Sequence, residues 1–536
     1  MKQSPRWLAW HQTGVSAESA NSGSTRSPPP EEAGRYARGG PARTDRRRAA
    51  LVRLLAPILL LGLSGCLLGP DYVRPKVDVP PSFRFEYRDA SDVANTLWWE
   101  QFQDPVLNEL IETSLANNLD VKAATARVDE FIGQFVSTRS ALFPQVSAGF
   151  DASRQRASKS GAVPLPAGVG PVYNQFQPSL SAAWDIDLFG KVRRETEAAR
   201  ANLLGSEQSR RATILTLVAS VASSYIALRS LDRQLEIAQD TTKSRAESVQ
   251  VFELRFKGGQ MSQMELAQSQ SEYEAAAATI PQLEAQIAQA EDALSVLLGR
   301  NPEPILRGRV LAGLGTPAVP AGLPSDLLER RPDLQQAEQN LIAQNALIGA
   351  ARALYFPSIS LTGLFGSLSS RFSNLFTGPA KVWSFAGSVT VPIFTGGNIT
   401  GQVRQAEARQ QEALFAYEKA IQVAFQQVED ALIALQKSRE QLDIQGKQVD
   451  ALRTYLRLAR MRYEGGYTSY IDVLDAERSL FNAELQYTQT QSTTLTSLVG
   501  LYMAMGGGWV VQAERMIAPP PGGQPAAAHE PVAETQ

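Results

Sequence analysis

Two aspartates three residues apart, Asp472 and Asp475, follow a glycine pair, Gly465 and Gly466, in the stretch RYEGGYTSYIDVLDAE. The glycines interrupt a long helical pattern, so the aspartates lie at the start of the next predicted helix. Carboxylates at this place have two interpretations. They are favoured near the positive end of any helix, and rings of carboxylates contributed by symmetric copies of a chain select cations in a pore.

The residues needed for most catalytic sites are missing from the sequence. The chain has one cysteine, Cys66, and two histidines, His11 and His529, which lie in its terminal segments. A zinc site, a Cys–His pair and a Ser–His–Asp triad therefore cannot be assembled in the folded part. The glycines in GGGW, residues 506–509, lack the lysine of a phosphate-binding loop. We expect no enzyme, no metal and no cofactor, although chemistry based on carboxylates alone remains open.

The charge balance argues against nucleic acid as a partner. The 52 lysines and arginines nearly match the 54 aspartates and glutamates, for a formal net charge of −2. No basic stripe with interleaved aromatic residues is present, which a nucleic-acid surface would need. Balanced charges on long helices indicate solvated, paired faces.

The N-terminal segment explains the single cysteine. Arginines at 46–48 and 53 precede an apolar run, residues 54–63, which is shorter than the roughly 20 residues of a membrane-spanning helix and has the length of a signal-peptide core. It ends in Leu63-Ser64-Gly65-Cys66, which resembles a bacterial lipobox. We expect cleavage before Cys66 and attachment of diacylglycerol and an N-acyl lipid there. A secretory signal with an incidental cysteine is the alternative.

Two further expectations concern this leader. Leu67 stands where retention in the inner membrane would favour aspartate, so the lipobox resemblance implies the outer membrane. The leader is also long, and we expect translation to start at Val52. Sequencing the N-terminus of the unprocessed precursor checks this, because residues upstream of Val52 would contradict it.

The sequence contains an internal repeat. Arg255 and Arg462 are 207 residues apart (462 − 255), and the same offset relates Gly258-Gly259 to Gly465-Gly466 and Gly299 to Gly506. A second offset, 213, relates the preceding segments, which we expect to be helices at about 104–142 and 325–355. Apolar residues recur every seven positions in both copies, which predicts long helices with coiled-coil-like packing. Residues 192–257 contain no proline and one glycine, so one helix could be roughly 100 Å long.

Four segments with a period of two follow the short helices. They lie at about 145–155, 177–188, 358–367 and 384–394, and they are largely apolar on one side and small or polar on the other. Such alternation over about ten residues is typical of transmembrane β-strands. The alternative is an ordinary half-buried sheet.

Strands in a membrane cannot leave open edges, because unpaired backbone groups in hydrocarbon cost several kcal/mol each. The smallest bacterial barrels have eight strands, so four strands per chain predict an oligomer. Two chains would close a barrel filled by side chains, whereas three would close twelve strands with room for a channel.

The predicted organisation follows from these boundaries. It comprises a removed leader at 1–65, a lipidated segment at 66–103, a first repeat at 104–299, a linker or equatorial segment at 300–324, a second repeat at 325–509, and a disordered C-terminal tail at 510–536.

Several motifs resemble those of the TolC/OprM family of outer-membrane factors, in particular its NodT-type lipoproteins of resistance–nodulation–division (RND) efflux systems. These motifs are the lipobox followed by GPDYVRP, then WDIDLFGKVR, VPIFTGGNI, RYEGGYTSYIDVLDAE and GLYMAMGGGW, and they extend over about residues 66–509. The resemblance implies a mixed α and β membrane protein. It would be a trimer whose twelve-stranded barrel crosses the outer membrane of a Gram-negative bacterium and continues into a periplasmic α-helical barrel with a mixed equatorial domain.

The resemblance also implies roles for residues at the hairpin turns. Asp472 and Asp475 match aspartates around the periplasmic constriction, and Ile471 matches a neighbouring apolar position. Tyr463 and Glu265 match groups that form contacts between neighbouring coils in the closed state.

The turns themselves would contain Gly258, Gly259, Gly465 and Gly466. This sequence departs from the TolC pattern at Thr468, in place of a gate arginine, and at Met264, in place of a polar partner. The contacts that lock the gate therefore cannot be predicted.

The implied function is the exit duct of a tripartite efflux pump, which passively conducts drugs, metals or other solutes. The implied partners are a periplasmic adaptor (membrane fusion) protein, an inner-membrane RND pump and outer-membrane lipid. Two alternatives share parts of this pattern, namely an exit duct for type I protein secretion and a coiled-coil surface lipoprotein without a channel. The exported solute cannot be predicted, because a wide conduit leaves selection to the pump.

Overall fold

The computed structural model describes residues 67–85, 96–158, 170–320, 322 and 324–517, all of which belong to the second of two compact units, residues 65–536. The predicted leader, Cys66 and both histidines lie outside the described residues. The elements are η1 (Trp98–Phe102), α2 (Pro105–Asn117), α3 (Leu119–Ser140), β1 (Gln145–Arg156), β2 (Val172–Ile186), α4 (Lys191–Lys257), α5 (Gln263–Leu297), η2 (Leu311–Gly313), η3 (Pro324–Asp326), α6 (Leu327–Arg330), α7 (Pro332–Ala353), β3 (Ser358–Ser367), η4 (Phe372–Asn374), η5 (Gly378–Ala380), β4 (Lys381–Thr390), α8 (Asn398–Glu464), α9 (Tyr470–Ala504) and α10 (Val510–Glu514).

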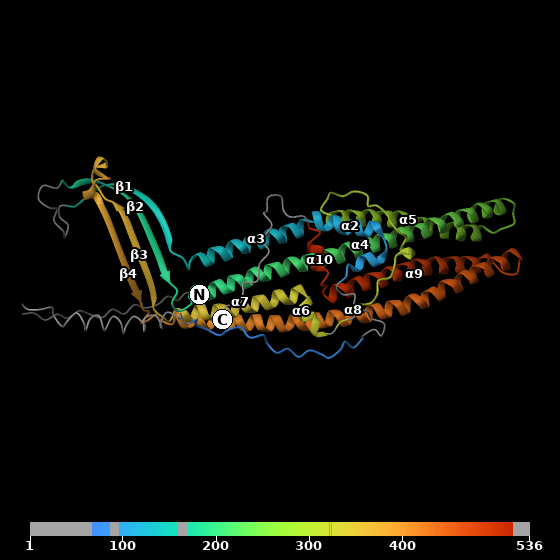
Figure 1. The fold of residues 1–536 in the computed structure, drawn as a ribbon. Coiled ribbons are helices and arrows are strands. Elements are labelled where there is room, and N and C mark those ends of the chain that lie inside the picture. Colours follow the sequence, from blue (N-terminus) through green and yellow to red (C-terminus); the bar gives the residue numbers. More distant parts are fainter. Residues whose placement is uncertain (1–66, 86–95, 159–169, 321, 323, 518–536) are drawn as a thin grey trace, which may run out of the picture. The chain divides into compact units, whose positions relative to one another are not determined.

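The same order of elements occurs twice along the chain. Each half has a short helix, two strands, a helix of 67 residues and a helix of 35 residues (Figure 1). Helices α8 and α9 begin 207 residues after α4 and α5 (398 − 191 and 470 − 263), and both pairs end at the same offset. Helix α7 begins 213 residues after α3 (332 − 119). The helix bounds therefore follow the two offsets of the sequence.

The four strands form one antiparallel sheet in the order β1-β2-β3-β4. Residues that are directly paired across antiparallel strands point to the same side. Phe150 pairs with Pro178, Leu180 with Phe365, and Phe365 with Trp383, so one face is largely apolar across all strands, with Arg154, Arg156 and Lys381 at one end of it. Its apolar members are Val146, Ala148, Phe150, Ala152, Phe176, Pro178, Leu180, Ala182, Trp184, Ile186, Ile359, Leu361, Gly363, Phe365, Trp383, Phe385, Gly387 and Val389.

The opposite face of the sheet is small and polar. Hydroxyl pairs bridge neighbouring strands there, at 2.8 Å between Ser147 and Ser181 and at 2.7 Å between Ser360 and Ser388. Phe150, Trp383 and Phe385 on the apolar face are exposed in the single chain. Within the described residues, β1 and β4 each have one edge without a partner strand.

Two strands differ in extent from their predicted segments. Strand β2 begins at Val172 because it pairs with the whole length of β1, as far as Arg156. Strand β4 occupies Lys381–Thr390 instead of 384–394. Pro392 has no N–H for a ladder, so pairing ends at Thr390, and Ile393 is 96% exposed.

The short helices of both halves are interrupted, where the sequence predicted continuous helices over 104–142 and 325–355. Asn118 separates α2 from α3, and its side-chain oxygen accepts bonds from the backbone N–H groups of Asp120 and Val121. In the second half, Arg331 is extended and precedes Pro332, the first residue of α7. An extended conformation is expected for a residue before proline.

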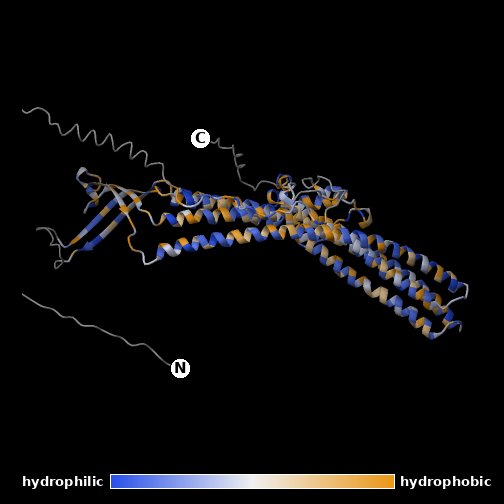
Figure 2. Cartoon of the chain, turned by 90° about the horizontal axis from the view of Figure 1, so that it is seen from below, coloured by the Kyte–Doolittle hydropathy of each residue, from blue (hydrophilic) through white to orange (hydrophobic). Residues whose placement is uncertain are grey.

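The core lies where the long helices meet the linker and the chain ends. Helix α4 packs against α3, α5, α7 and α9, and α8 packs against α7 and α9. Polar and apolar residues are interleaved along these helices (Figure 2). One 18-residue window of α4 is apolar enough to cross a membrane by length and composition, but 67% of it is buried within the protein, as in an ordinary core helix.

The predicted disordered tail is wrong for its first residues. Helix α10 follows Trp509, whose side chain is 0% exposed, and Val510 and Ala513 are also buried. Trp509 contacts Trp98 and Trp99 edge to face, at ring centroid distances of 6.2 and 5.2 Å. Trp98 and Trp99 belong to the predicted lipidated segment, so residues that precede the first repeat and residues that close the second contribute to one core. Residues 518–536 lie outside the described part.

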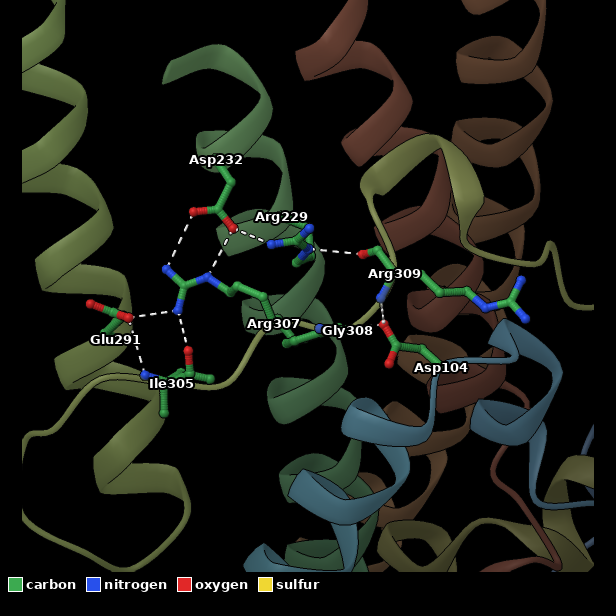
Figure 3. A network of polar contacts seen from close by, with 9 residues as sticks. Asp104, Arg229, Asp232, Glu291, Ile305, Arg307, Gly308 and Arg309 are labelled. Carbon is green, nitrogen blue, oxygen red and sulfur yellow. Dashed lines mark hydrogen bonds and ion pairs between the residues drawn. The ribbon is translucent and has the colours of Figure 1, made fainter. Parts of the chain in front are cut away.

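The linker at 300–324 is fastened to the helices by a polar network (Figure 3). Arg307 pairs with Asp232 of α4 at 2.9 Å and with Glu291 of α5 at 2.6 Å. Asp104, the N-cap residue of α2, accepts bonds from the Arg309 backbone N–H at 2.9 Å and from the Tyr225 hydroxyl at 2.8 Å. Burial raises the pKa of Tyr225, so its phenol stays protonated as a donor.

Replacement of Trp509 by alanine tests the contribution of the C-terminal segment to the core. We expect Trp509→Ala to lower the free energy of unfolding by about 3–5 kcal/mol, because a fully buried indole is lost. Val511→Ala is the matched control, since Val511 lies in the same short helix but is exposed. Thermal unfolding of the purified protein in detergent measures both, and equal midpoints for the two variants would contradict the assignment.

Candidate helix-tip constriction

The candidate site consists of the two turns that connect the long helices. The first turn joins α4 to α5 through Gly258 and Gly259, and the second joins α8 to α9 through Gly465 and Gly466. The second glycine of each pair has a positive φ, +71° at Gly259 and +74° at Gly466. This left-handed conformation favours glycine, which explains why both copies contain the pair.

Both turns use the same helix-ending hydrogen bonds. The N–H of Gln260 donates to the carbonyl of Arg255 at 2.9 Å, and the N–H of Tyr467 donates to the carbonyl of Arg462 at 2.9 Å. These bonds, which span five residues, together with the glycine in the left-handed conformation, define a Schellman motif. The turns therefore reverse the chain with satisfied backbone groups.

The first turn holds Glu265 within its own helix. The Ser262 hydroxyl accepts the Glu265 N–H at 3.3 Å, and the Glu265 carboxylate accepts the Ser262 N–H at 3.1 Å, which is a capping box. The bonds described for Glu265 thus stabilise the start of α5. Met264 beside it is exposed.

The second turn presents the two aspartates at the start of α9. Asp472 lies in the first turn of this helix and accepts a hydrogen bond from the Thr468 hydroxyl. Asp475 is exposed and pairs with Arg478 at 2.8 Å. Ile471 is 56% exposed. Thr468 therefore fixes the orientation of the Asp472 carboxylate, while Ile471 and the Asp475–Arg478 pair are exposed on the surface of the chain.

An aromatic cluster joins the two turns within one chain. The ring of Phe252 in α4 lies 4.2 Å from that of Tyr470 in α9, and Tyr463 of α8 lies 5.1 Å from Tyr470. The guanidinium of Arg255 donates to the Tyr463 hydroxyl at 3.0 Å and lies over its ring. Tyr463 therefore connects the coils α4 and α8, whereas the bonds of Glu265 are local.

An ion pair that the sequence analysis missed lies beside this cluster. Arg460 of α8 pairs with Glu477 of α9 at 2.7 Å, and Glu477 is 8% exposed. Burial, followed by the Glu477 charge, raises the pKa of Tyr470 to about 12. No signal in the sequence indicated this pair, because its partners come from different helices and helical spacing relates only residues of one helix.

The chemistry available at the tip is electrostatic. Among the described residues, no group of three or more histidine, cysteine, aspartate or glutamate side chains is placed to hold a metal. The hollow between α4, α8 and α9 has a volume of about 300 Å³ and is lined by Glu247, Arg255, Arg460, Tyr463 and Glu477, among others. The arrangement offers charges and aromatic rings to a passing solute or a neighbouring chain.

Known proteins match nearly the whole of this fold. The family model described as "Outer membrane efflux protein" matches residues 110–300 and 323–507. The chain is 38% identical over 471 residues to the probable efflux pump outer membrane protein TtgC of Pseudomonas putida, which covers 86% of this chain and 96% of that protein. It is 34% identical over 465 residues to the probable outer membrane lipoprotein SilC of Salmonella typhimurium, with 86% and 99% covered.

A solved structure has the same fold. The open state of the Neisseria gonorrhoeae MtrE outer membrane channel superimposes with a TM-score of 0.75 and 35% sequence identity, and the match covers 83% of this chain and 99% of that one. The described residues of the present chain therefore adopt the architecture of an outer-membrane channel.

These matches define a class of efflux channels, and the chain belongs to the outer membrane efflux protein family. It is an outer-membrane channel of an efflux system in a Gram-negative bacterium. The resemblance to the TolC/OprM family, the outer-membrane location and the efflux function predicted from the sequence are thereby confirmed.

Two neighbouring glycines provide a matched test of the turn. We expect Gly259→Ala to destabilise the turn by about 1–2 kcal/mol, because alanine must adopt a positive φ. Gly258→Ala is the control, since its φ is −83° and an added Cβ would meet only ordinary contacts at 3.6 Å. Amide hydrogen exchange over residues 250–266 measures local opening, and equal exchange in both variants would contradict the expectation.

Proposed function

We propose that three copies of this chain form the exit duct of a tripartite efflux pump, with a twelve-stranded barrel in the outer membrane and an α-helical barrel in the periplasm. The sheet carries this proposal. One chain has four strands, an apolar face and two unpaired edges among the described residues. In hydrocarbon each unpaired backbone group costs several kcal/mol, so the edges must pair with other copies.

The number of copies follows from the size of the channel. Two chains would give eight strands, whose interior is filled by side chains. Three chains close twelve strands around a threefold axis, with the apolar face toward lipid and the serine-rich face toward water. In this trimer β1 of each chain pairs with β4 of its neighbour.

The helical part extends the duct toward the partner proteins. Helices α4 and α8 have 67 residues each, which corresponds to about 100 Å at 1.5 Å per residue. The matching bounds of the two halves support an internal twofold repeat, so three chains supply six similar hairpins. We propose that their tips meet a periplasmic adaptor and that an inner-membrane RND pump supplies the energy. The duct itself conducts drugs or other small solutes passively and catalyses no reaction.

The constriction is proposed at the second turn. Asp472 and Asp475 occupy the first two turns of α9, and a threefold axis would gather six carboxylates there. Such a ring favours cations, and Ile471 beside it would add an apolar barrier that gates by dewetting. Tyr463 would hold coils together in the closed state through Arg255, while Glu265 would contribute by fixing the start of α5.

The lipid anchor completes the proposal. Cys66 lies outside the described residues, and its diacylglycerol and N-acyl chains are proposed from the lipobox sequence. The described chain begins at Leu67, whose side chain packs closely on Gly190, between the end of β2 and the start of α4. Leu67 thus lies beside the junction of β2 and α4.

Removal of both carboxylates tests the constriction. We expect Asp472→Ala with Asp475→Ala to raise single-channel conductance and to reduce cation preference, because six charges leave a narrow neck. Asp443→Ala is the control, since this exposed aspartate of α8 pairs with Lys447. Planar bilayer recordings with a salt gradient measure both quantities. Unchanged conductance and selectivity in the double variant would remove these residues from the constriction.

Replacement of the cysteine tests the anchor. We expect Cys66→Ser to abolish incorporation of labelled palmitate into the mature protein and to leave an uncleaved precursor, because the thiol accepts the diacylglyceryl group. Metabolic labelling and intact-protein mass spectrometry measure these outcomes. Normal processing and lipid content in Cys66→Ser would contradict the lipobox assignment.

A further inference from the structure

The two 35-residue helices end on equivalent residues of the two halves. The Asn118 side-chain amide donates to the carbonyl of Leu297, at the end of α5, at 2.9 Å. The Arg331 guanidinium donates to the carbonyl of Ala504, at the end of α9, at 3.0 Å. Arg331 is 213 residues after Asn118 (331 − 118), and Ala504 is 207 after Leu297 (504 − 297). Both offsets are those of the repeat, so the contact occurs twice.

A glycine makes the close approach possible in each half. Gly299 and Gly506 follow the helix ends with φ values of +71° and +61°. A Cβ on Gly299 would lie 2.3 Å from the carbonyl oxygen of Asn117, and one on Gly506 would lie 2.4 Å from Cγ of Arg331. Both contacts would be too short for any side chain, so the junctions are built in the same way.

The two junctions differ in charge and in the number of helices they hold. Asn118 is neutral, and its other bonds cap α3. Arg331 is 6% exposed, and its guanidinium also bonds Asp333 of α7 at 2.7 and 3.0 Å and Gln427 of α8 at 2.7 Å. It therefore joins three helices. A cation at the carbonyl end of a helix is further favoured by the helix dipole, and charge-assisted bonds are stronger than neutral ones.

The far end of α9 carries the proposed constriction. Helix α9 has 35 residues, or about 50 Å, with Asp472 in its first turn and Ala504 as its last residue. A tilt of about 10° at the Arg331 junction would move the first turn by about 9 Å, from this length and simple geometry. The movement of the tip is therefore set by the junction together with the packing of α9 on α4 and α8.

We propose that Arg331 is a positioning residue for the constriction, because it fixes the end of α9 to α7 and α8 and thereby sets where Asp472 and Asp475 lie. This inference rests on the proposed function, in which these aspartates form the narrow neck. Arg331 acts through α9 and does not contact the solute. The Asn118 junction has no such role, since the other end of α5 carries the Glu265 capping box instead of constriction carboxylates.

The experiment compares Arg331→Asn, which copies the residue of the first half, with Asn118→Ala. Full-length mature protein is purified from the outer membrane and recorded in planar bilayers. We expect Arg331→Asn to raise the resting conductance about twofold or more and to lower cation preference. The reason is that Asp472 and Asp475 would no longer be held at the proposed narrow neck. We expect Asn118→Ala to leave both quantities unchanged while lowering the thermal midpoint, because it loses a buried hydrogen bond.

Two comparisons separate the possible failures. If the Asp472 and Asp475 double variant changes conductance but Arg331→Asn does not, the positioning role is wrong and the constriction stands. If neither changes conductance, the proposed constriction itself is wrong. A purely structural role would lower the thermal midpoint of Arg331→Asn without altering conductance.

A second variant keeps the test decisive if Arg331→Asn does not assemble. Arg331→Lys retains a cation at the end of α9 but loses the planar fork that bonds Asp333 and Gln427 together. We expect the conductance of Arg331→Lys to lie between that of the wild type and that of the double variant Asp472→Ala with Asp475→Ala. Wild-type conductance and selectivity in Arg331→Lys would overturn the proposal.

Discussion

The structure depends on one constraint, which is that backbone N–H and C=O groups in a membrane must be paired. A chain that contributes four strands with an apolar face cannot meet this constraint alone, because β1 and β4 retain unpaired edges within the described residues. In the proposed trimer, closure by other copies would remove the edges and create the pore in one step. The polar face, with its Ser147–Ser181 and Ser360–Ser388 pairs, would then line water. Under this proposal, membrane insertion and oligomerisation are a single physical requirement.

In the helical part, the two halves of the repeat share their backbone geometry but differ in the residues at the turns and junctions. Both turns end with a glycine in the left-handed conformation, and both return helices dock beside an interrupted short helix. The copies differ in the residues placed on this common frame. In the first turn Ser262 and Glu265 cap α5, whereas the second turn is followed by Asp472, which is half-buried, and Asp475, which is exposed. The first junction uses a neutral amide, whereas the second uses a buried guanidinium that reaches three helices. The geometry of the two junctions is kept, and the charge of the residue that binds the helix end differs.

The long helices are held together near their middle by the linker and by an aromatic cluster. Arg307 and Asp104 attach the linker to α2, α4 and α5, and the tryptophans of the two chain ends pack on each other in the same region. The helix tips have a separate, small hydrophobic cluster that includes Phe252, Tyr470 and Val473. If the proposed duct opens at its tip, the contacts that must change include Arg255–Tyr463 and Arg460–Glu477.

The sequence by itself determined the repeated elements, the glycine turns and the alternating strands, because helix period, strand period and left-handed glycine are local properties of the chain. It also placed the two aspartates at a helix start. Tertiary structure decided what depends on distant partners. Asn118 and Arg331, which separate the short helices, also bind the carbonyl ends of α5 and α9, and Trp509 packs edge to face on Trp98 and Trp99. The pairing of Arg460 with Glu477 likewise joins two helices whose rotation no local pattern specifies.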